Sequence, residues 1–151
     1  MKPSADFVKD LITFPARLNA IPKVLYEDPD IYRLELEKLF YGRHWHPIAH
    51  MGEIPAPGDF KTTFLGELPV LVTHQPDGTP GVFHNACAHR GTQLVTPFLG
   101  KGTEFQCPYH RWLFDNCGNL RAAPSENDFP EDFRREDYGL RKVRVEVFKG
   151  L

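Results

Sequence analysis

Two short clusters constrain this chain more than any other feature, because each pairs one thiol with one imidazole. The first reads Cys87-Ala88-His89-Arg90-Gly91 and the second Cys107-Pro108-Tyr109-His110-Arg111-Trp112. A lone Cys or His says little, since buried thiols behave as small hydrophobes and most histidines satisfy only local hydrogen bonds. Two matching pairs predict instead the ligands of one metal centre. The candidate ligands are Cys87, His89, Cys107 and His110.

Size and composition favour a folded domain around this centre. A chain of 151 residues can bury roughly 70% of its unfolded surface as a single domain. The net charge of -2 indicates no general affinity for nucleic acid or acidic membranes. No apolar stretch reaches the roughly 20 residues of a membrane helix, and the N-terminus lacks the apolar core of a signal peptide. We therefore expect a cytoplasmic protein.

The other cysteine and histidine positions are expected to be structural. Three cysteines are an odd number, which argues against a disulfide framework and leaves thiols free for metal in a reducing compartment. Cys117 lies in an Asp-Asn-Cys-Gly-Asn turn with no His at ligand spacing, so we interpret it as a bystander. The remaining histidines are interpreted as packing or surface residues: His44, His46, His50, His74 and His84.

The N-terminal segment, residues 1–42, is predicted to be helical. A short helix over 6–14 would end before Pro15, because the residue preceding a proline is pushed out of the helical region, and extended coil would follow to Pro22. Asp28-Pro29 then predicts a helix start, with an N-cap followed by proline at the first helical position. Apolar residues recur at i, i+4, i+7 and i+8, which predicts a helix over 29–41 that Gly42 ends. These apolar residues are Tyr32, Leu36, Leu39 and Phe40.

The rest of the chain, residues 43–151, is predicted to be mainly β. Short β-rich runs alternate with turns, which indicates antiparallel strands. The expected strands are 58–65, 68–74, 81–84, 103–106, 111–114, 119–121 and 141–147, with a strand start at 45–49 and turns at 76–79 and 100–102. Both ligand pairs then lie on loops at hairpin tips, where a rigid sheet commonly carries a site.

The C-terminal region combines a polar loop with an alternating strand. Residues 122–138 contain six acidic side chains against two arginines and are interpreted as a solvated connecting loop. Alternation over 141–147 predicts a half-buried strand. It runs into Lys149-Gly150 and one more apolar residue, in the manner of a hairpin cut at its tip. We therefore expect a fragment of a longer protein.

The mixed ligand pairs favour an iron-sulfur cluster over zinc. Zinc accepts two Cys and two His, but its structural sites tend to place like ligands together in each arm. Here each arm carries one Cys and one His, so both arms reach two irons symmetrically. This is the Rieske [2Fe-2S] arrangement, with two cysteines on one iron and two histidines on the other. Neutral imidazoles leave the oxidised centre formally uncharged, so adding an electron costs less than in a four-cysteine cluster.

Five motifs point to a known family. They are Tyr41-Gly42-Arg43-His44-Trp45, Pro57-Gly58-Asp59-Phe60, Leu68-Pro69-Val70-Leu71-Val72, Asn85-x-Cys87-x-His89-Arg90-Gly91 and Cys107-Pro108-Tyr109-His110-x-Trp112-x-Phe114-Asp115. From about Asp28 to Leu151, the chain resembles the N-terminal Rieske domain of the α subunits of aromatic-ring-hydroxylating oxygenases. The resemblance implies an antiparallel β-sandwich of the Rieske type with two cluster-binding loops, preceded by short N-terminal helices.

The resemblance also implies a role. In that family the cluster takes an electron from a ferredoxin or reductase and passes it to a mononuclear non-haem Fe(II), which activates O2 for attack on an aromatic ring. The whole protein would then be an oxidoreductase of aromatic catabolism, assembled with other α and sometimes β subunits. The catalytic iron would lie in a catalytic domain after residue 151, so this stretch alone would carry only electron transfer. The residues expected around the ligands are Arg90, Gly91, Tyr109 and Trp112.

Several alternatives stay open at this point. A free-standing Rieske ferredoxin would use the same ligands, although the N-terminal helices disfavour it, and a structural zinc module is the third candidate. Arg111 stands where the family often has Gly, either as a cation that perturbs the loop or raises the potential, or as a solvent-facing side chain. Between Asn85 and Arg121, four basic side chains stand against two acidic ones, a local charge of +2 that predicts an acidic redox partner.

Overall fold

The structure is a computed structural model that describes residues 22–151. The predicted helix over 6–14 lies outside the described residues, as does all but the last residue of the coil expected to reach Pro22. The chain divides into two compact units, residues 1–46 and residues 47–151. Within the described residues, no helix is both long and apolar enough to cross a membrane.

The first unit contains α2 (Val24–Glu27), α3 (Pro29–Glu35) and the π-helical turn η1 (Leu36–Phe40). Asp28 caps α3 as predicted, since its side chain accepts hydrogen bonds from the backbone N–H groups of Asp30 (2.8 Å) and Ile31 (3.3 Å). The helix predicted over 29–41 is therefore confirmed to within one residue.

The predicted apolar stripe on this helix is only partly right. Ile31 and Leu36 are buried, whereas Tyr32 and Leu39 are 45% and 50% exposed. The hydrogen bond from Tyr41 N–H to the Leu36 carbonyl spans five residues, as in a π-helix. That wider turn rotates the residues after Leu36 away from the positions that a 3.6-residue period predicts.

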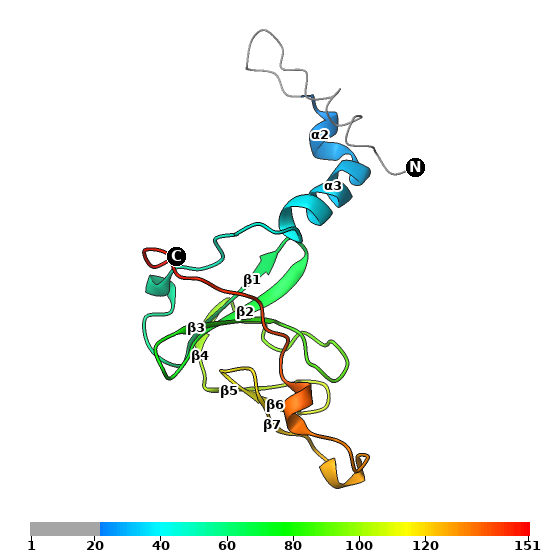
Figure 1. Ribbon diagram of the computed structural model, residues 1–151, viewed down its shortest axis with the longest axis vertical. Helices are drawn as coiled ribbons and strands as arrows, with labels where there is room; N and C mark the ends of the chain where they lie inside the picture. Colours follow the sequence, from blue (N-terminus) through cyan, green and yellow to red (C-terminus); the bar gives the residue numbers. More distant parts are fainter. Residues whose placement is uncertain (1–21) are drawn as a thin grey trace. The chain divides into compact units, whose positions relative to one another are not determined.

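The second unit holds two antiparallel sheets (Figure 1). The four-stranded sheet has the order β3-β2-β1-β4 and the three-stranded sheet the order β5-β6-β7. Their strands are β1 (Asp59–Leu65), β2 (Leu68–His74), β3 (Pro80–His84), β4 (Leu99–Lys101), β5 (Glu104–Gln106), β6 (Leu113–Asp115) and β7 (Leu120–Ala122). A short 3₁₀ turn, η2 (Met51–Glu53), precedes β1.

Six of these strands confirm the sequence prediction, and β4 corrects it. Residues 100–102 were expected to form a turn, but β4 pairs with β1 and places Gly100 opposite Phe60. A Cβ atom on Gly100 would lie 2.5 Å from Cζ of Phe60. The missing side chain therefore lets the Phe60 ring cover the neighbouring strand, a contact between distant residues that local turn residues do not reveal.

Buried polar bonds tie the two sheets together. Thr73 of β2 is fully buried, and its hydroxyl donates to the backbone carbonyl of Asn116 (2.7 Å) in the turn after β6. Asn116 returns a bond from its side-chain amide to the carbonyl of His74 (3.3 Å). Around this link the larger core cluster fills the space with apolar side chains, including Leu71, Phe83 and Phe114.

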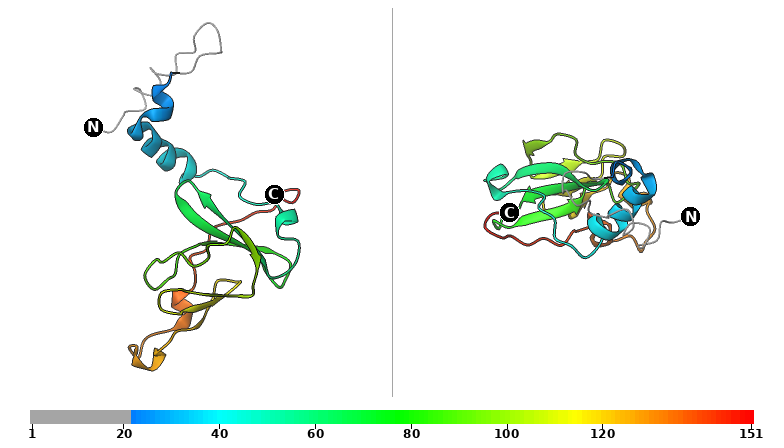
Figure 2. Two further views of the ribbon diagram at one scale, coloured as in Figure 1. Left: turned by 180° about the vertical axis from the view of Figure 1, so that it is seen from behind. Right: turned by 90° about the horizontal axis from the view of Figure 1, so that it is seen from above.

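The C-terminal region differs from the prediction in two places. The strand expected over 141–147 is reduced to one bridge between Lys142 and Phe83, although Val143 and Val145 pack on the smaller core cluster as the alternation implied. The stretch 122–138 is more than a solvated loop, because it forms the 3₁₀ turns η3 (Glu126–Asp128) and η4 (Arg135–Tyr138). In both side views this stretch lies beside β5–β7 (Figures 1 and 2). No strand forms at 45–49.

We predict that Gly100→Ala lowers the free energy of unfolding by about 1–3 kcal/mol, the usual cost of overpacking a well-packed site. The added methyl group would collide with the buried ring of Phe60. Gly102→Ala is the matched control, since its nearest neighbour would be 3.6 Å away. Urea denaturation of both variants measures the difference, and equal stability of the two would contradict the assigned contact.

Candidate metal centre

The two predicted ligand loops fold in the same way. In the loop between β3 and β4, the Cys87 carbonyl accepts a hydrogen bond from Gly91 N–H (2.8 Å), and Cys87 N–H donates to the Thr92 carbonyl (2.8 Å). The loop between β5 and β6 repeats both bonds at the same sequence offsets. There they join Cys107 to Arg111 (3.0 Å) and to Trp112 (2.8 Å). The backbone N–H and the backbone carbonyl of each cysteine are therefore both hydrogen-bonded within its own loop.

These bonds require a left-handed residue at the fourth position after each cysteine. Gly91 has φ +72° and Arg111 has φ +60°. Glycine adopts this conformation without cost, whereas an L-residue with a Cβ atom is strained there. Arg111 therefore occupies the position that Gly91 occupies in the other loop, which explains why glycine is expected at residue 111.

Both candidate cysteines are free thiols in the protein interior. Cys87 is 3% exposed and Cys107 1% exposed. Burial raises the pKa of the Cys87 thiol, and the neighbouring Cys107 adds to the effect. Water cannot solvate thiolates at these two adjacent buried positions. A positively charged metal would stabilise the deprotonated form of both thiols.

The two candidate histidines lie next to each other. The ring centroids of His89 and His110 are 4.7 Å apart with an interplanar angle of 67°. Burial lowers the pKa of His89, and the neighbouring His110 and Arg90 lower it further. Nδ1 of His89 is buried and has no hydrogen-bond partner among the described residues. A neutral imidazole nitrogen in that state fits a metal ligand.

No group of three or more His, Cys, Asp or Glu side chains within residues 22–151 is arranged around a single ion. A two-iron cluster does not require such a group, because each iron takes only two protein ligands and the sulfides complete its coordination. The buried thiols and the unpartnered His89 nitrogen thus fit a two-iron cluster.

Aromatic rings and one buried amide surround the candidate ligands. The Trp112 indole stacks on the His89 ring, with 4.8 Å between ring centroids and 10° between ring planes. The ring centroids of Tyr109 and His110 are 3.8 Å apart. Asn85 is fully buried, and its side-chain amide exchanges two hydrogen bonds with the backbone of Val95 (2.7 and 2.9 Å). Asn85 closes the base of the first loop. Asn85 stands in one of the sequence motifs, but its role was not predicted, because its bonds join residues ten positions apart.

The other histidines and Cys117 have local roles. His46 stacks on Phe40 and places Nε2 3.0 Å from the Leu39 carbonyl, while Nδ1 of His50 accepts a bond from Gly52 N–H. His74 lies 2.7 Å from the Ile54 carbonyl. These contacts agree with the interpretation of these three histidines as structural. Burial raises the pKa of the Cys117 thiol, which keeps it protonated in its turn.

Comparison with known proteins agrees with this geometry. The family model described as the Rieske [2Fe-2S] domain matches residues 44–144. This chain belongs to the Rieske [2Fe-2S] domain family. Membership in the family implies a [2Fe-2S] cluster as the bound group.

Curated relatives and solved structures are oxygenase subunits. The chain is 39% identical over 137 residues to the anthranilate 1,2-dioxygenase large subunit of Burkholderia cepacia, covering 87% of this chain and 32% of the relative. It is 42% identical over 127 residues to the biphenyl 2,3-dioxygenase subunit alpha of Rhodococcus jostii (strain RHA1), covering 84% and 27%. Naphthalene 1,2-dioxygenase from Rhodococcus sp., bound to indole, superposes with a TM-score of 0.83 at 28% identity, covering 97% and 34%.

The chain therefore spans about a third of the length of these relatives. The relatives are named as large or alpha subunits of dioxygenases, which does not favour the alternative of a free-standing ferredoxin. The sandwich expected from the resemblance agrees with the two antiparallel sheets and with the structural neighbours.

We predict opposite effects of substitution at the two left-handed positions. Nothing lies within 4 Å of a Cβ atom added at Gly91, so Gly91→Ala introduces no clash. Its left-handed backbone alone should lower the free energy of unfolding by about 1 kcal/mol. Arg111→Gly should raise it by about 0.5–1 kcal/mol by removing the same strain. Urea denaturation of the cluster-free chain measures both. Changes of the same sign would show that the two loops are not equivalent.

Proposed function

We propose that this chain is the electron-transfer domain of an aromatic-ring-hydroxylating oxygenase and holds a Rieske [2Fe-2S] cluster through Cys87, His89, Cys107 and His110. The unpartnered buried Nδ1 of His89 is the observation that carries the assignment. It occurs where the sequence spacing predicts a ligand, beside a second imidazole, in a unit with two buried free thiols. A bound cluster would accept and release one electron.

The residues of the chain have separate tasks in this proposal. The Cys87 and Cys107 thiolates would bind one iron, and the neutral imidazoles of His89 and His110 the other. The repeated backbone bonds hold the peptide units on both sides of each cysteine. Trp112 and Tyr109 pack against the imidazoles and restrict their orientation.

The whole protein would be a ring-hydroxylating dioxygenase large subunit, and residues 1–151 only its first part. Residues 1–42 would form a helical segment and residues 43–151 the Rieske domain. Catalysis would require a mononuclear non-haem Fe(II) in a catalytic domain outside these residues. A ferredoxin or reductase would donate the electron, and other α or β subunits would complete the assembly. The odd cysteine count supports a reducing compartment such as the cytoplasm.

Spectroscopy of the iron-loaded chain tests the proposed cluster. We expect a coloured protein with about two irons per chain and, after reduction, the EPR signal of a mixed-ligand [2Fe-2S] centre. Ala substitution of His89 or His110 should abolish that signal, whereas Ala substitution of His44 should keep it. A colourless protein with stoichiometric zinc would refute the proposal.

Substitution of a histidine ligand by cysteine tests the charge argument. Provided that the cluster forms, His89→Cys or His110→Cys should lower the reduction potential, because each exchange replaces a neutral ligand with an anionic one and makes the added electron more costly. Protein-film voltammetry measures the shift. An unchanged or higher potential would contradict the assignment of these two histidines.

The salt dependence of reduction tests the proposed partner. The local charge of +2 between Asn85 and Arg121 supports an acidic donor protein, and attraction between exposed charges weakens as salt screens them. The second-order rate of reduction by a ferredoxin should therefore fall as ionic strength rises. A rate that is independent of salt would remove the electrostatic part of the proposal.

A further inference from the structure

Three aromatic side chains cover the buried face of Trp112, and we name them the aromatic cover. Their ring centroids lie 5.6–6.2 Å from Trp112: Phe129, Phe133 and Tyr138. They also contact one another, with 4.7 Å between Phe129 and Phe133 and 4.8 Å between Phe133 and Tyr138. Trp112 itself is 4% exposed and stacks on His89. The aromatic cover thus lies one ring away from a proposed cluster ligand.

The backbone does little to hold this aromatic cover in place. Among the described residues, the backbone–backbone hydrogen bonds within its segment each join an N–H to the carbonyl three residues earlier. They run from Asp128 to Ser125, Phe129 to Glu126, Phe133 to Pro130, and Asp137 to Arg134. Its next backbone–backbone bond to the rest of the unit is at Leu140, whose N–H donates to the Gly118 carbonyl (2.7 Å). Side chains must therefore fix the aromatic cover over Trp112.

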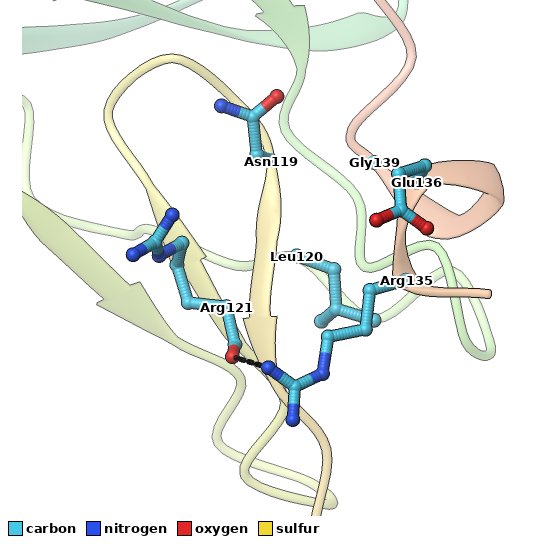
Figure 3. Close-up of a pocket in the computed structure, with 6 residues that line it drawn as sticks. All are labelled: Asn119, Leu120, Arg121, Arg135, Glu136 and Gly139. Carbon is cyan, nitrogen blue, oxygen red and sulfur yellow. Dashed lines mark hydrogen bonds between the residues drawn. The ribbon is translucent and has the colours of Figure 1, made fainter.

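One guanidinium group connects three parts of this region. Arg135 in η4 donates from Nε to both carboxylate oxygens of Glu126 in η3 (2.8 and 2.9 Å) and from Nη2 to one of them (2.6 Å). Its Nη1 donates to the backbone carbonyl of Arg121 in β7 (2.8 Å; Figure 3). Such forked bonds from arginine to a carboxylate and a carbonyl impose a defined geometry.

Arg135 also lines a pocket of about 370 Å³. Figure 3 shows its lining, which is Asn119, Leu120, Arg121, Arg135, Glu136 and Gly139. Side-chain bonds of Arg135 therefore join η3 and η4, the turns that flank Phe129 and Phe133, to strand β7.

We propose that the Glu126–Arg135 pair is a positioning clamp that keeps the aromatic cover closed over Trp112 and so keeps water away from the cluster at His89. The inference rests on the proposed electron-transfer function. Reduction adds a negative charge to the cluster, and water stabilises that charge better than aromatic rings do. The closed aromatic cover therefore lowers the reduction potential, and opening it raises the potential.

The test uses Glu126→Ala, which removes the acceptor of the clamp, and Arg135→Lys, which keeps the charge but loses the fork. Glu136→Ala is the matched control, because Glu136 lies in the same segment and acts on Arg135 through its charge, whereas the hydrogen bonds of Arg135 go to Glu126 and Arg121. All variants are made with Trp45→Phe, which leaves Trp112 as the only tryptophan. Acrylamide quenching of the cluster-free chain reports access to Trp112, and voltammetry of the cluster-loaded chain reports the potential.

We expect Glu126→Ala and Arg135→Lys to increase the quenching constant of Trp112 about twofold or more, as local opening exposes the indole, and to raise the potential. Glu136→Ala should change neither. An unchanged quenching constant would overturn the proposed clamp. An increased quenching constant with an unchanged reduction potential would overturn its effect on the cluster and leave the ion pair as a structural contact. Equal potential shifts in Glu126→Ala and Glu136→Ala would assign the effect to charge alone. A chain that takes up no cluster would overturn the proposed function, and Trp112 quenching would still show whether the pair closes the aromatic cover.

Discussion

The candidate site depends on one repeated backbone arrangement. In each loop the cysteine carbonyl accepts from the residue four positions later, and the cysteine N–H donates to the carbonyl five positions later. This closes a small ring that fixes the cysteine and leaves the histidine on the enclosed turn. The histidine is the second residue after Cys87 but the third after Cys107. The ring tolerates that difference because its bonds do not pass through the histidine.

Buried polar bonds carry this arrangement into the sheets. Asn85 fixes the base of the first loop through Val95, and Thr73 joins β2 to the turn that follows β6. Each of these side chains is fully buried, so a lost partner would leave an unsatisfied polar group in the core. The relative position of the two loops therefore depends on a few specific bonds as well as on apolar packing.

Sequence patterns predicted those elements whose causes are local. Alternating apolar residues and turn residues identified six strands, and the Cys/His spacing identified the candidate ligands. Strand β4 was missed because Leu99-Gly100-Lys101 has turn residues, and its pairing depends on the distant ring of Phe60. The stretch 122–138 was predicted to be a solvated loop because of its acidic residues. Its composition gave no sign that Phe129 and Phe133 contact Trp112. Contacts between residues far apart in sequence leave no periodic signal.

The strained position of Arg111 shows how the second loop differs from the first. Its neighbours are firmly held, since Trp112 is 4% exposed and Cys107 is 1% exposed. A residue in a sparsely populated conformation persists when the surrounding structure determines it more than once. In the first loop the residue at the position of Trp112 is Thr92, which is only partly buried. Trp112 packs under the aromatic cover and stacks on His89, and the same buried residue directly follows Arg111, where a fixed neighbour helps to hold the strained backbone.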